Sequence, residues 1–193
     1  LIMSTKDHVL RFLEEKKGQA VSGSEIAEAL SLSRASVWKA VHALQEEGYP
    51  ISAASKRGYS LAQNSDILSS ASILPYLHSG CTLNKLHVYK ELGSTNTTAK
   101  AMANDQAPHG TVVIAEHQTA GKGRLGRSFY SPGAQGVYLS VVLRLNESTD
   151  VSMLVTSAAA VAVCRAIRAV SGIEAQIKWV NDVYIDGKKV CGI

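Results

Sequence analysis

The chain has 193 residues, of which 46% are hydrophobic and 19% are charged. This composition excludes a disordered or fibrous protein and is sufficient for one or two folded domains. Its 20 basic and 16 acidic residues give a formal charge of +4, a mild excess that suits nucleic acid or a nucleotide without establishing either. The three cysteines form no C-x-x-C pair, which argues against a disulfide framework or a cysteine-based zinc site and favours a reducing compartment.

Residues 1–62 predict a winged helix-turn-helix. Apolar residues mark one face of a first helix (Val9, Leu10, Leu13), of a short second helix (Ile26, Ala27, Leu30) and of a third (Val37, Val41, Leu44). Ser22 and Glu25 have the spacing of a capping box, and Ser33 is placed to cap the third helix. Residues 51–61 then indicate two short strands around a turn that ends in Gly58, a residue that allows positive φ.

The distribution of charge favours DNA as the partner of this region. Residues 1–62 hold eight basic and seven acidic residues, but the cations gather on the third helix and at the wing tip. The candidate DNA contacts are Ser33, Arg34, Ser36, Lys39, Lys56 and Arg57. Trp38 could also face DNA, although we expect it to pack against a neighbouring domain. The alternative is a helical interaction domain with ordinary surface charges.

A polar segment at residues 63–72 is predicted to be a linker, followed by a second domain over residues 73–193. The predicted strands cover 87–92, 111–116, 136–145, 175–179, 183–185 and 188–193, and the predicted helices cover 97–103 and 151–170. The apolar run in the second helix is interpreted as too short and too polar for a bilayer, so we expect a buried helix. We find no secretion signal at the N-terminus.

Two segments of the second domain suggest ligand binding. Ser94, Thr95 and Asn96 follow a strand and precede a helix, where hydroxyls and backbone N–H groups can hold a neutral polar ligand or simply cap the helix. Lys178 ends another strand and is followed by Asn181 and Asp182. Because it lies between two apolar residues, we expect Lys178 to be partly buried. Its partner would be an anionic ligand or, equally, Asp182.

A third segment combines glycines with cations. Gly121, Gly123 and Gly126 match G-x-G-x-x-G, but the dinucleotide fingerprint requires a helix directly afterwards, and the following segment, residues 128–133, contains proline and glycine. Lys122, Arg124 and Arg127 are three cations without an acid. We favour a phosphate-binding loop that a polyanionic ligand orders. The alternatives are a solvated surface loop and a second nucleic-acid contact.

Three segments now occur together and in order: Gly93-Ser94-Thr95-Asn96, the loop from Gln118 to Arg127, and Lys178-Trp-x-Asn-Asp182. With the winged helix, they resemble the bifunctional biotin protein ligases of the biotin operon repressor type, over about residues 6–193. The resemblance implies an α+β fold, in which a winged helix-turn-helix precedes a mixed-sheet catalytic domain like that of class II synthetases. The family pattern continues past Ile193, so we expect only the N-terminal part of that catalytic domain.

The resemblance also implies an activity. Biotin and ATP, with Mg²⁺, would give biotinyl-5′-AMP, and biotin would pass to a lysine of a biotin carboxyl carrier domain. The adenylate would also act as corepressor, driving formation of a homodimer and binding to operator DNA, in the cytoplasm and without a membrane partner.

Site roles carry over by motif. Biotin would contact Ser94, Thr95, Asn96, Gln118, Lys122, Gly123, Arg124 and Lys178. The nucleotide would contact Gly121, Arg127, Trp179 and Asn181, and Asp182 would be a metal ligand. Lys178 and Arg124 are the candidate catalytic residues, acting electrostatically on two anions that must approach each other.

Two positions depart from the family pattern. Lys122 stands where the family often has arginine, which keeps the charge and loses bidentate geometry, and Val180 replaces the usual proline. Two other functions stay open: a transcription factor that senses a small ligand without ligase activity, and a lipoate-type acyl ligase or transferase. The glycine-arginine loop and the DNA-binding domain favour biotin over lipoate.

Overall fold

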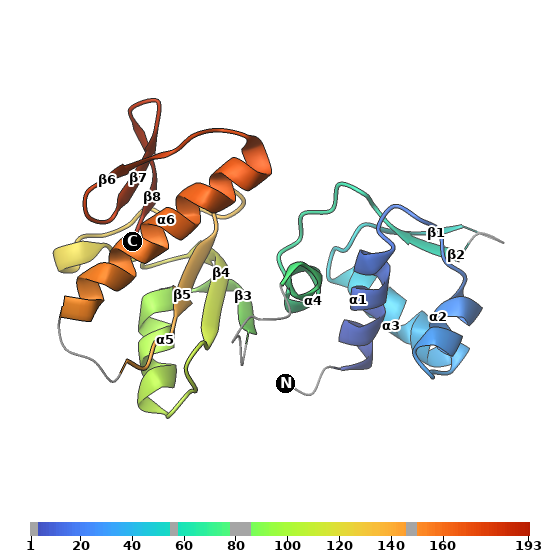
Figure 1. Cartoon of the computed structure of the whole chain (residues 1–193). Coiled ribbons are helices and arrows are strands. Elements are labelled where there is room, and N and C mark those ends of the chain that lie inside the picture. Colours follow the sequence, from blue (N-terminus) through green and yellow to red (C-terminus); the bar gives the residue numbers. More distant parts are fainter. Residues whose placement is uncertain (1–3, 55–57, 78–85, 146–149) are drawn as a thin grey trace. The chain divides into compact units, whose positions relative to one another are not determined.

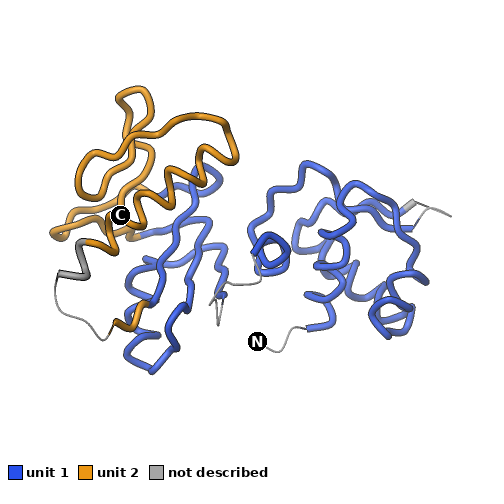
Figure 2. The backbone as a smooth tube through the Cα atoms, in the orientation of Figure 1, with its two compact units in different colours: residues 1–119, 131–142 blue, residues 120–130, 143–193 orange. Residues whose placement is uncertain are grey.

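The computed structural model describes residues 4–54, 58–77, 86–145 and 150–193. The chain divides into two compact units, shown in Figure 2. Unit 1 comprises residues 1–119 and 131–142, and unit 2 comprises residues 120–130 and 143–193.

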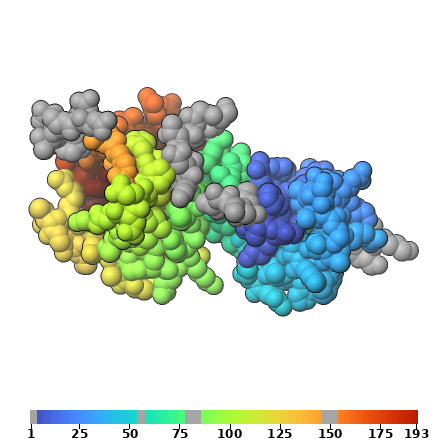
Figure 3. All heavy atoms as spheres, turned by 90° about the horizontal axis from the view of Figure 1, so that it is seen from below, coloured from blue at the N-terminus to red at the C-terminus, as the bar shows by residue number. Residues whose placement is uncertain are grey.

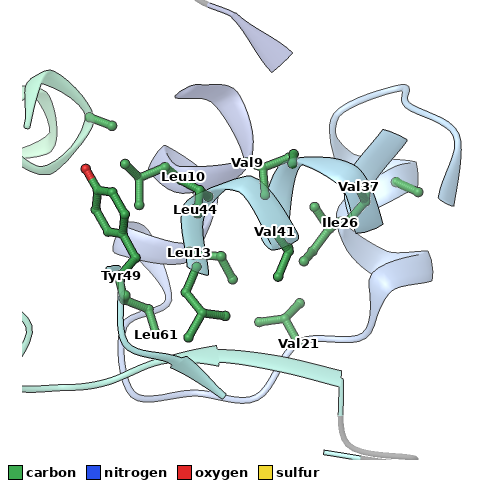
Figure 4. Close-up of a cluster of buried hydrophobic side chains, with 14 residues drawn as sticks. Val9, Leu10, Leu13, Val21, Ile26, Val37, Val41, Leu44, Tyr49 and Leu61 are labelled. Atoms are coloured by element: carbon green, nitrogen blue, oxygen red, sulfur yellow. The ribbon is translucent and has the colours of Figure 1, made fainter. Parts of the chain in front are cut away.

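The N-terminal part of unit 1 has the predicted winged helix-turn-helix order. Helices α1 (Thr5–Glu15), α2 (Gly23–Ala29) and α3 (Arg34–Glu46) precede strands β1 (Ile51–Ala54) and β2 (Gly58–Leu61), which pair antiparallel (Figure 1). The apolar faces of the three helices meet in one core, where Leu13, Ile26 and Leu44 are almost completely buried (Figure 4). The helical periodicity therefore identified the core correctly.

The helix caps match the prediction in part. Ser33 Oγ accepts from Ser36 N at 3.1 Å and Ser22 Oγ accepts from Glu25 N at 3.1 Å. The second half of the predicted capping box is wrong, because the Glu25 carboxylate accepts from Lys16 Nζ at 2.9 Å in place of the Ser22 amide. A complete capping box instead begins α1, where Ser4 and Asp7 exchange both bonds.

Gly58 is required by both its backbone conformation and its surroundings. Its φ is +85°, and a Cβ there would lie 2.1 Å from the carbonyl oxygen of Val21. Val21 and Tyr59 form an antiparallel bridge with two backbone bonds of 2.8 Å. This bridge attaches the segment before α2 to the base of the wing. The wing tip with Lys56 and Arg57 lies outside the described residues.

The segment predicted to be a linker, residues 63–72, contacts the N-terminal core. Ala71, in helix α4 (Ser70–Ile73), is 2% exposed within the same apolar cluster as Leu10, and Ile67 packs against that cluster. Lys17 Nζ donates to the carbonyl of Ser65 at 2.6 Å. The 3₁₀ helix η1 (Leu74–Tyr76) follows α4 directly. The segment predicted to be a linker is therefore anchored to the N-terminal core by a few apolar side chains.

A mixed three-stranded sheet forms the rest of unit 1. Strand β3 (Leu86–Leu92) pairs parallel with β4 (Val112–Gln118), and β4 pairs antiparallel with β5 (Tyr138–Val141). Helix α5 (Thr95–Asn104) lies against this sheet (Figure 1). Its Ala99 packs in a second cluster with Val113 and Val142. Strand β5 is shorter than the predicted 136–145.

Unit 2 combines the glycine loop, one long helix and an antiparallel sheet. Helix α6 (Asp150–Ser171) contacts strands β6 (Gln176–Lys178) and β7 (Asp182–Ile185), and β8 (Lys188–Gly192) completes the order β6-β7-β8. The predicted hairpin turn is confirmed at Asp186 and Gly187, with φ values of 49° and 75°.

The prediction that α6 is buried is wrong. Leu154 is 68% exposed and Val170 is 90% exposed, while Ala160 is buried. The window of residues 154–171, with mean hydropathy 1.5, is long and apolar enough for a membrane span by length and composition, which also corrects our estimate of its length. Only 6% of that window is buried. Apolar composition shows that a helix can be buried, but the burial itself depends on a partner surface.

Candidate active site and nucleic-acid interface

The described DNA-contact candidates lie on the exposed face of α3. Arg34 and Lys39 are exposed, whereas Ser33 and Ser36 bond each other at the N-terminus of the helix, with 2.8 Å between their Oγ atoms. Trp38 is 56% exposed and lies with its ring centroid 5.2 Å from that of His42. An exposed aromatic ring therefore accompanies the two cations on the face predicted to meet DNA.

A buried cluster of neutral polar side chains forms at the C-terminal ends of β3 and β4. Gln118 Oε1 accepts from Thr95 N at 2.7 Å and from Thr95 Oγ1 at 3.1 Å, while Gln118 Nε2 donates to Ser131 Oγ at 2.9 Å. Gln118 is 9% exposed, and Thr95 and Ser131 are 4% and 3% exposed. The parallel register pairs Leu92 with Gln118 and explains why the two segments meet.

Strand β5 adds a further hydroxyl to this cluster. Ser140 Oγ lies 2.6 Å from Asn96 Oδ1 and 2.9 Å from Thr95 Oγ1. Ser94 is buried at the N-cap position of α5, although within the described chain its side chain forms no capping bond. The structure therefore brings together Ser94, Thr95, Asn96 and Gln118, as expected. A set of neutral donors and acceptors can orient a neutral polar ligand, because no ion must lose its water.

Sequence reasoning missed Ser131 and Ser140. The structure places Ser140 inward: Leu139 and Val141 are exposed, whereas Ser140 is 8% exposed on the opposite face of β5, although the apolar alternation of residues 136–145 favoured the reverse. A small polar residue in the inward row of a strand indicates a hydrogen-bonding role. Ser131 carried no comparable local pattern.

The glycine loop of unit 2 closes on itself as a small hairpin. Phe129 N donates to the carbonyl of Gly121 and Gly123 N donates to that of Arg127, both at 2.8 Å, and a 3₁₀ turn η2 (Arg124–Gly126) forms the tip. Lys122, Arg124 and Arg127 are exposed, and the atoms of this segment, yellow in Figure 3, form part of the surface in that view. The predicted absence of a dinucleotide-type helix is confirmed, since turns and extended backbone follow up to β5.

Arg124 connects this loop to the strand that bears the candidate catalytic lysine. Its Nη1 donates to Asn181 Oδ1 at 3.0 Å, across 57 positions of sequence. Asn181 lies just before β7, and β7 pairs Asp182 with Lys178 of β6. Residues 121–127 and the end of the Lys178 strand therefore meet within unit 2. This arrangement gathers cations around one strand end, which suits an anionic ligand.

Two expectations about Lys178 and Asp182 need correction. Lys178 is exposed, not partly buried, and its Nζ lies 5.4 Å from the centroid of the Tyr184 ring. Within the described part of the chain it forms no ion pair, because Asp182 Oδ1 accepts from Lys189 Nζ at 2.7 Å. Trp179 is also largely exposed, at 75%.

Asp182 does not fit the predicted role of a metal ligand. Its Oδ1 already accepts from the Lys189 ammonium and from Asn181 Nδ2 at 2.9 Å, and a cation so close opposes a second one. Among the residues that the structure describes, no group of three His, Cys, Asp or Glu side chains could hold a metal ion. Asp182 Oδ1 is therefore already occupied by an ammonium and an amide in this structure.

The fold and site define a helix-turn-helix protein joined to a ligase-type domain, and a helix-turn-helix domain model matches residues 5–60. The chain belongs to the biotin/lipoate A/B protein ligase family, whose model matches residues 88–193. The expected resemblance to biotin protein ligases and the expected fold class are confirmed.

Individual relatives agree with this family. The chain is 37% identical over 185 residues to the bifunctional ligase/repressor BirA of Bacillus subtilis, covering 96% of this chain and 57% of the relative. It is 29% identical over 176 residues to BirA of Escherichia coli, covering 91% and 53%. The biotin protein ligase from Aquifex aeolicus in complex with biotin and ATP matches with a TM-score of 0.50 and 32% identity, over 56% of this chain and 45% of that one. The chain thus spans about half the length of these relatives.

Proposed function

We propose that the chain belongs to a biotin protein ligase that is also a biotin-responsive repressor. The reaction joins biotin and ATP into biotinyl-5′-AMP and then transfers biotin to a lysine of a biotin carboxyl carrier domain. The observation that carries this proposal is the bond from Arg124 to Asn181, because it joins the basic loop to the Lys178 strand within the ligase family match.

Biotin is the substrate that the neutral cluster supports best. Its ureido ring is uncharged and needs both donors and acceptors, and Thr95, Gln118 and Ser140 supply hydroxyl and amide groups. Ser94 and Asn96 complete this set. Its carboxylate needs cations instead, so we assign its activated end to Lys122, Gly123, Arg124 and Lys178, and the nucleotide to Gly121, Arg127, Trp179 and Asn181.

The chemistry requires charge stabilisation and no protein nucleophile. A biotin carboxylate oxygen attacks the α-phosphorus of ATP, the new C–O–P anhydride forms, and the bond to pyrophosphate breaks. Because both reactants are anions, Lys178 and Arg124 lower the barrier by offsetting their charge. The carrier lysine amine then attacks the acyl carbon, loses a proton and releases AMP. Lys122 provides charge without bidentate geometry.

ATP and magnesium enter the proposal differently. The Aquifex aeolicus relative is described in complex with biotin and ATP, which supports ATP as the second substrate here. Magnesium is bound in many nucleotide sites through the phosphates themselves, and we assign it no ligand from this chain. ATP, carrier protein and operator DNA are found together in the cytoplasm, where we propose that the protein acts.

The repressor half of the proposal rests on the winged helix-turn-helix. We assign operator contacts to Ser33, Arg34, Ser36 and Lys39 on α3 and to Lys56 and Arg57 at the wing. We further propose that biotinyl-5′-AMP promotes a homodimer, which is the form that binds operator DNA. Residues 1–62 would be the DNA-binding domain, 63–72 the connection and 73–193 the catalytic part.

Two assays test the proposal. Biotin-dependent exchange of labelled pyrophosphate into ATP measures the first step, and transfer of biotin to a purified carrier domain measures the second. A ligand-sensing transcription factor would bind biotin without either activity. A lipoate-type enzyme would show exchange with lipoate and none with biotin. Only biotin-dependent exchange followed by transfer supports the ligase.

A further inference from the structure

Four polar side chains of unit 2 form one continuous line of hydrogen bonds. Arg124 Nη1 donates to Asn181 Oδ1 at 3.0 Å, Asn181 Nδ2 donates to Asp182 Oδ1 at 2.9 Å, and Lys189 Nζ donates to the same Oδ1 at 2.7 Å. The line begins in the glycine loop and ends on β8. Arg124 and Asn181 already have assigned roles, whereas Asp182 and Lys189 have none.

The chemistry of the two ends fixes the orientation of the amide between them. A guanidinium can only donate and a carboxylate can only accept, so Asn181 must present its oxygen to Arg124 and its nitrogen to Asp182. The backbone of Asn181 is held as well, since its carbonyl accepts from Ile193 N at 2.8 Å. Asp182 therefore helps to hold the Asn181 amide in the orientation in which its oxygen accepts from Arg124.

Lys178 and Lys189 are the two cations that Asp182 could pair with. Lys178 lies opposite Asp182 in the register of β6 and β7, and its Nζ is over the ring of Tyr184, the residue that pairs with Lys189 in β8. The side chains of these four residues share one face of the sheet, because they occupy paired or alternate positions. Asp182 is bonded to Lys189.

We propose that Lys189 is a positioning residue that occupies Asp182 and so leaves Lys178 available for an anionic ligand. Without Lys189, the Asp182 carboxylate turns to the neighbouring ammonium of Lys178. That movement neutralises the Lys178 charge and withdraws Asp182 from Asn181, so Arg124 loses its support. The link to an anionic ligand rests on the proposed function. The competition of Lys178 and Lys189 for Asp182 does not, and it can be tested without any ligand.

The surroundings of Lys189 support a defined path for its side chain. A Cβ built on Gly192 would lie 3.1 Å from both Cε and Nζ of Lys189, so the end of the lysine lies directly across this glycine. A side chain at position 192 would push the ammonium away by a few tenths of an ångström. The absence of a side chain there lets Lys189 lie beside Asp182.

Limited acetylation tests the competition without any ligand. The chain is treated with acetic anhydride, and mass spectrometry compares labelling of Lys178 with that of exposed Lys100. Lys189→Ala should lower the Lys178 ratio by about twofold to fivefold, the range expected for a newly formed exposed ion pair. Lys189→Ala combined with Asp182→Asn should restore it. Lys188→Ala, the neighbouring lysine on β8, is the matched control and should leave it unchanged.

The outcomes decide the inference in either direction. An unchanged Lys178 ratio in a folded Lys189→Ala variant would overturn it, as would a reduced ratio that Asp182→Asn fails to restore. Circular dichroism verifies the fold. If the alanine variant does not fold, Lys189→Gln removes the charge with less loss of packing, and the same two results apply to it. Lys189→Arg keeps the pair and should behave as the parent chain.

Titration with biotinyl-5′-AMP links the inference to the proposed function. Lys189→Ala should weaken binding by about twofold to fivefold, the double variant should regain part of the loss, and Lys188→Ala should bind normally. If the double variant loses as much affinity for biotinyl-5′-AMP as Lys189→Ala does, Lys189 acts on the ligand by another route. That result would overturn the proposed competition for Asp182. Absence of binding by the parent chain removes the proposed function, while the acetylation ratio still decides the role of Lys189.

Discussion

Gln118 caps helix α5 through Thr95, 23 positions earlier in the chain, by accepting from its backbone N–H at 2.7 Å. The side chain of an N-cap residue usually accepts from the second or third N–H of its helix, but Ser94 forms no such bond and Thr95 provides the first N–H of α5. Because a side chain from β4 accepts that N–H, the N-terminus of α5 is tied to the sheet. The cap and the proposed biotin cluster therefore share the side-chain amide of Gln118.

Gln118→Leu should destabilise the chain and abolish binding of biotin. The substitution removes the acceptor of the buried Thr95 backbone N–H and the bonds of Gln118 to Thr95 Oγ1 and Ser131 Oγ, which costs about 2 to 4 kcal/mol of unfolding free energy. Urea denaturation and calorimetric titration with biotin measure both effects. Gln135→Leu, at an exposed loop position of the same unit, is the control. Equal stability of the two variants would contradict the capping role.

Arg124→Ala should make the enzyme release biotinyl-5′-AMP prematurely. Loss of a charge-assisted contact weakens adenylate retention by about tenfold or more, and the free anhydride then labels nearby lysines. Biotinylation of a bystander protein, read by streptavidin blotting, should increase relative to the amount of adenylate formed, which itself falls because a catalytic cation is lost. Arg165→Ala on α6, another exposed arginine of unit 2, should have no effect. Unchanged retention of adenylate would remove Arg124 from the site.

Lys178→Ala should stop adenylate synthesis with little effect on folding. The side chain is exposed, so its removal should change the unfolding free energy by less than about 0.5 kcal/mol. Pyrophosphate exchange should fall by about a hundredfold or more, since a cation at the developing charge is lost. Lys100→Ala is the control at another exposed lysine. Normal exchange would show that Lys178 is not catalytic.

Gly58→Ala should destabilise the wing more than Gly48→Ala destabilises the end of α3. Both glycines have positive φ, +85° and +94°, but only the added Cβ of position 58 meets backbone, whereas nothing lies within 4 Å at position 48. The conformational cost alone is about 1 kcal/mol. Loss of the two bonds between Val21 and Tyr59 should add about 1 to 3 kcal/mol. Thermal unfolding of the two variants measures the difference in stability. Equal losses of stability would show that the contact between the Cβ at position 58 and the Val21 backbone has no effect.

Alkaline pH should destabilise the N-terminal core through Tyr49. Burial raises the pKa of this tyrosine, which is 9% exposed, so the unfolded chain releases the phenolic proton at lower pH than the folded chain. Stability is therefore fully present below the unfolded pKa of about 10. It falls by about 1.4 kcal/mol per pH unit as the pH rises toward the folded pKa. Urea titrations at pH 9 and pH 11 should show a smaller loss of unfolding free energy between the two pH values for Tyr49→Phe than for the parent chain.

Local pattern was enough to predict most elements of this fold. The buried positions of α3, the wing strands and the hairpin at Asp186 follow from helical period, alternation and turn chemistry, all of which operate over a few residues. The motif residues Thr95, Asn96 and Gln118 were also identified together, because their family resemblance is specific.

Other features depended on distant partners. The exposure of α6, the partner of Asp182 and the role of Ser131 depend on which segments meet. Composition predicted a buried α6, which is exposed, and a linker at residues 63–72, whose contacts with the N-terminal core gave no local signal. A sequence window shows what a segment could bury, while burial itself is decided by surfaces that lie elsewhere in the chain.

The position of Ala71 in the N-terminal core has a practical meaning for protein engineering. A DNA-reading module transplanted into a chimera would lose a core side chain if it were cut at residue 62, and would retain it if cut after Ile73. The stretch between is thus not an interchangeable tether. Replacing residues 63–72 with a glycine-serine spacer should lower the stability of the N-terminal domain, even though no residue of helix α3 is altered.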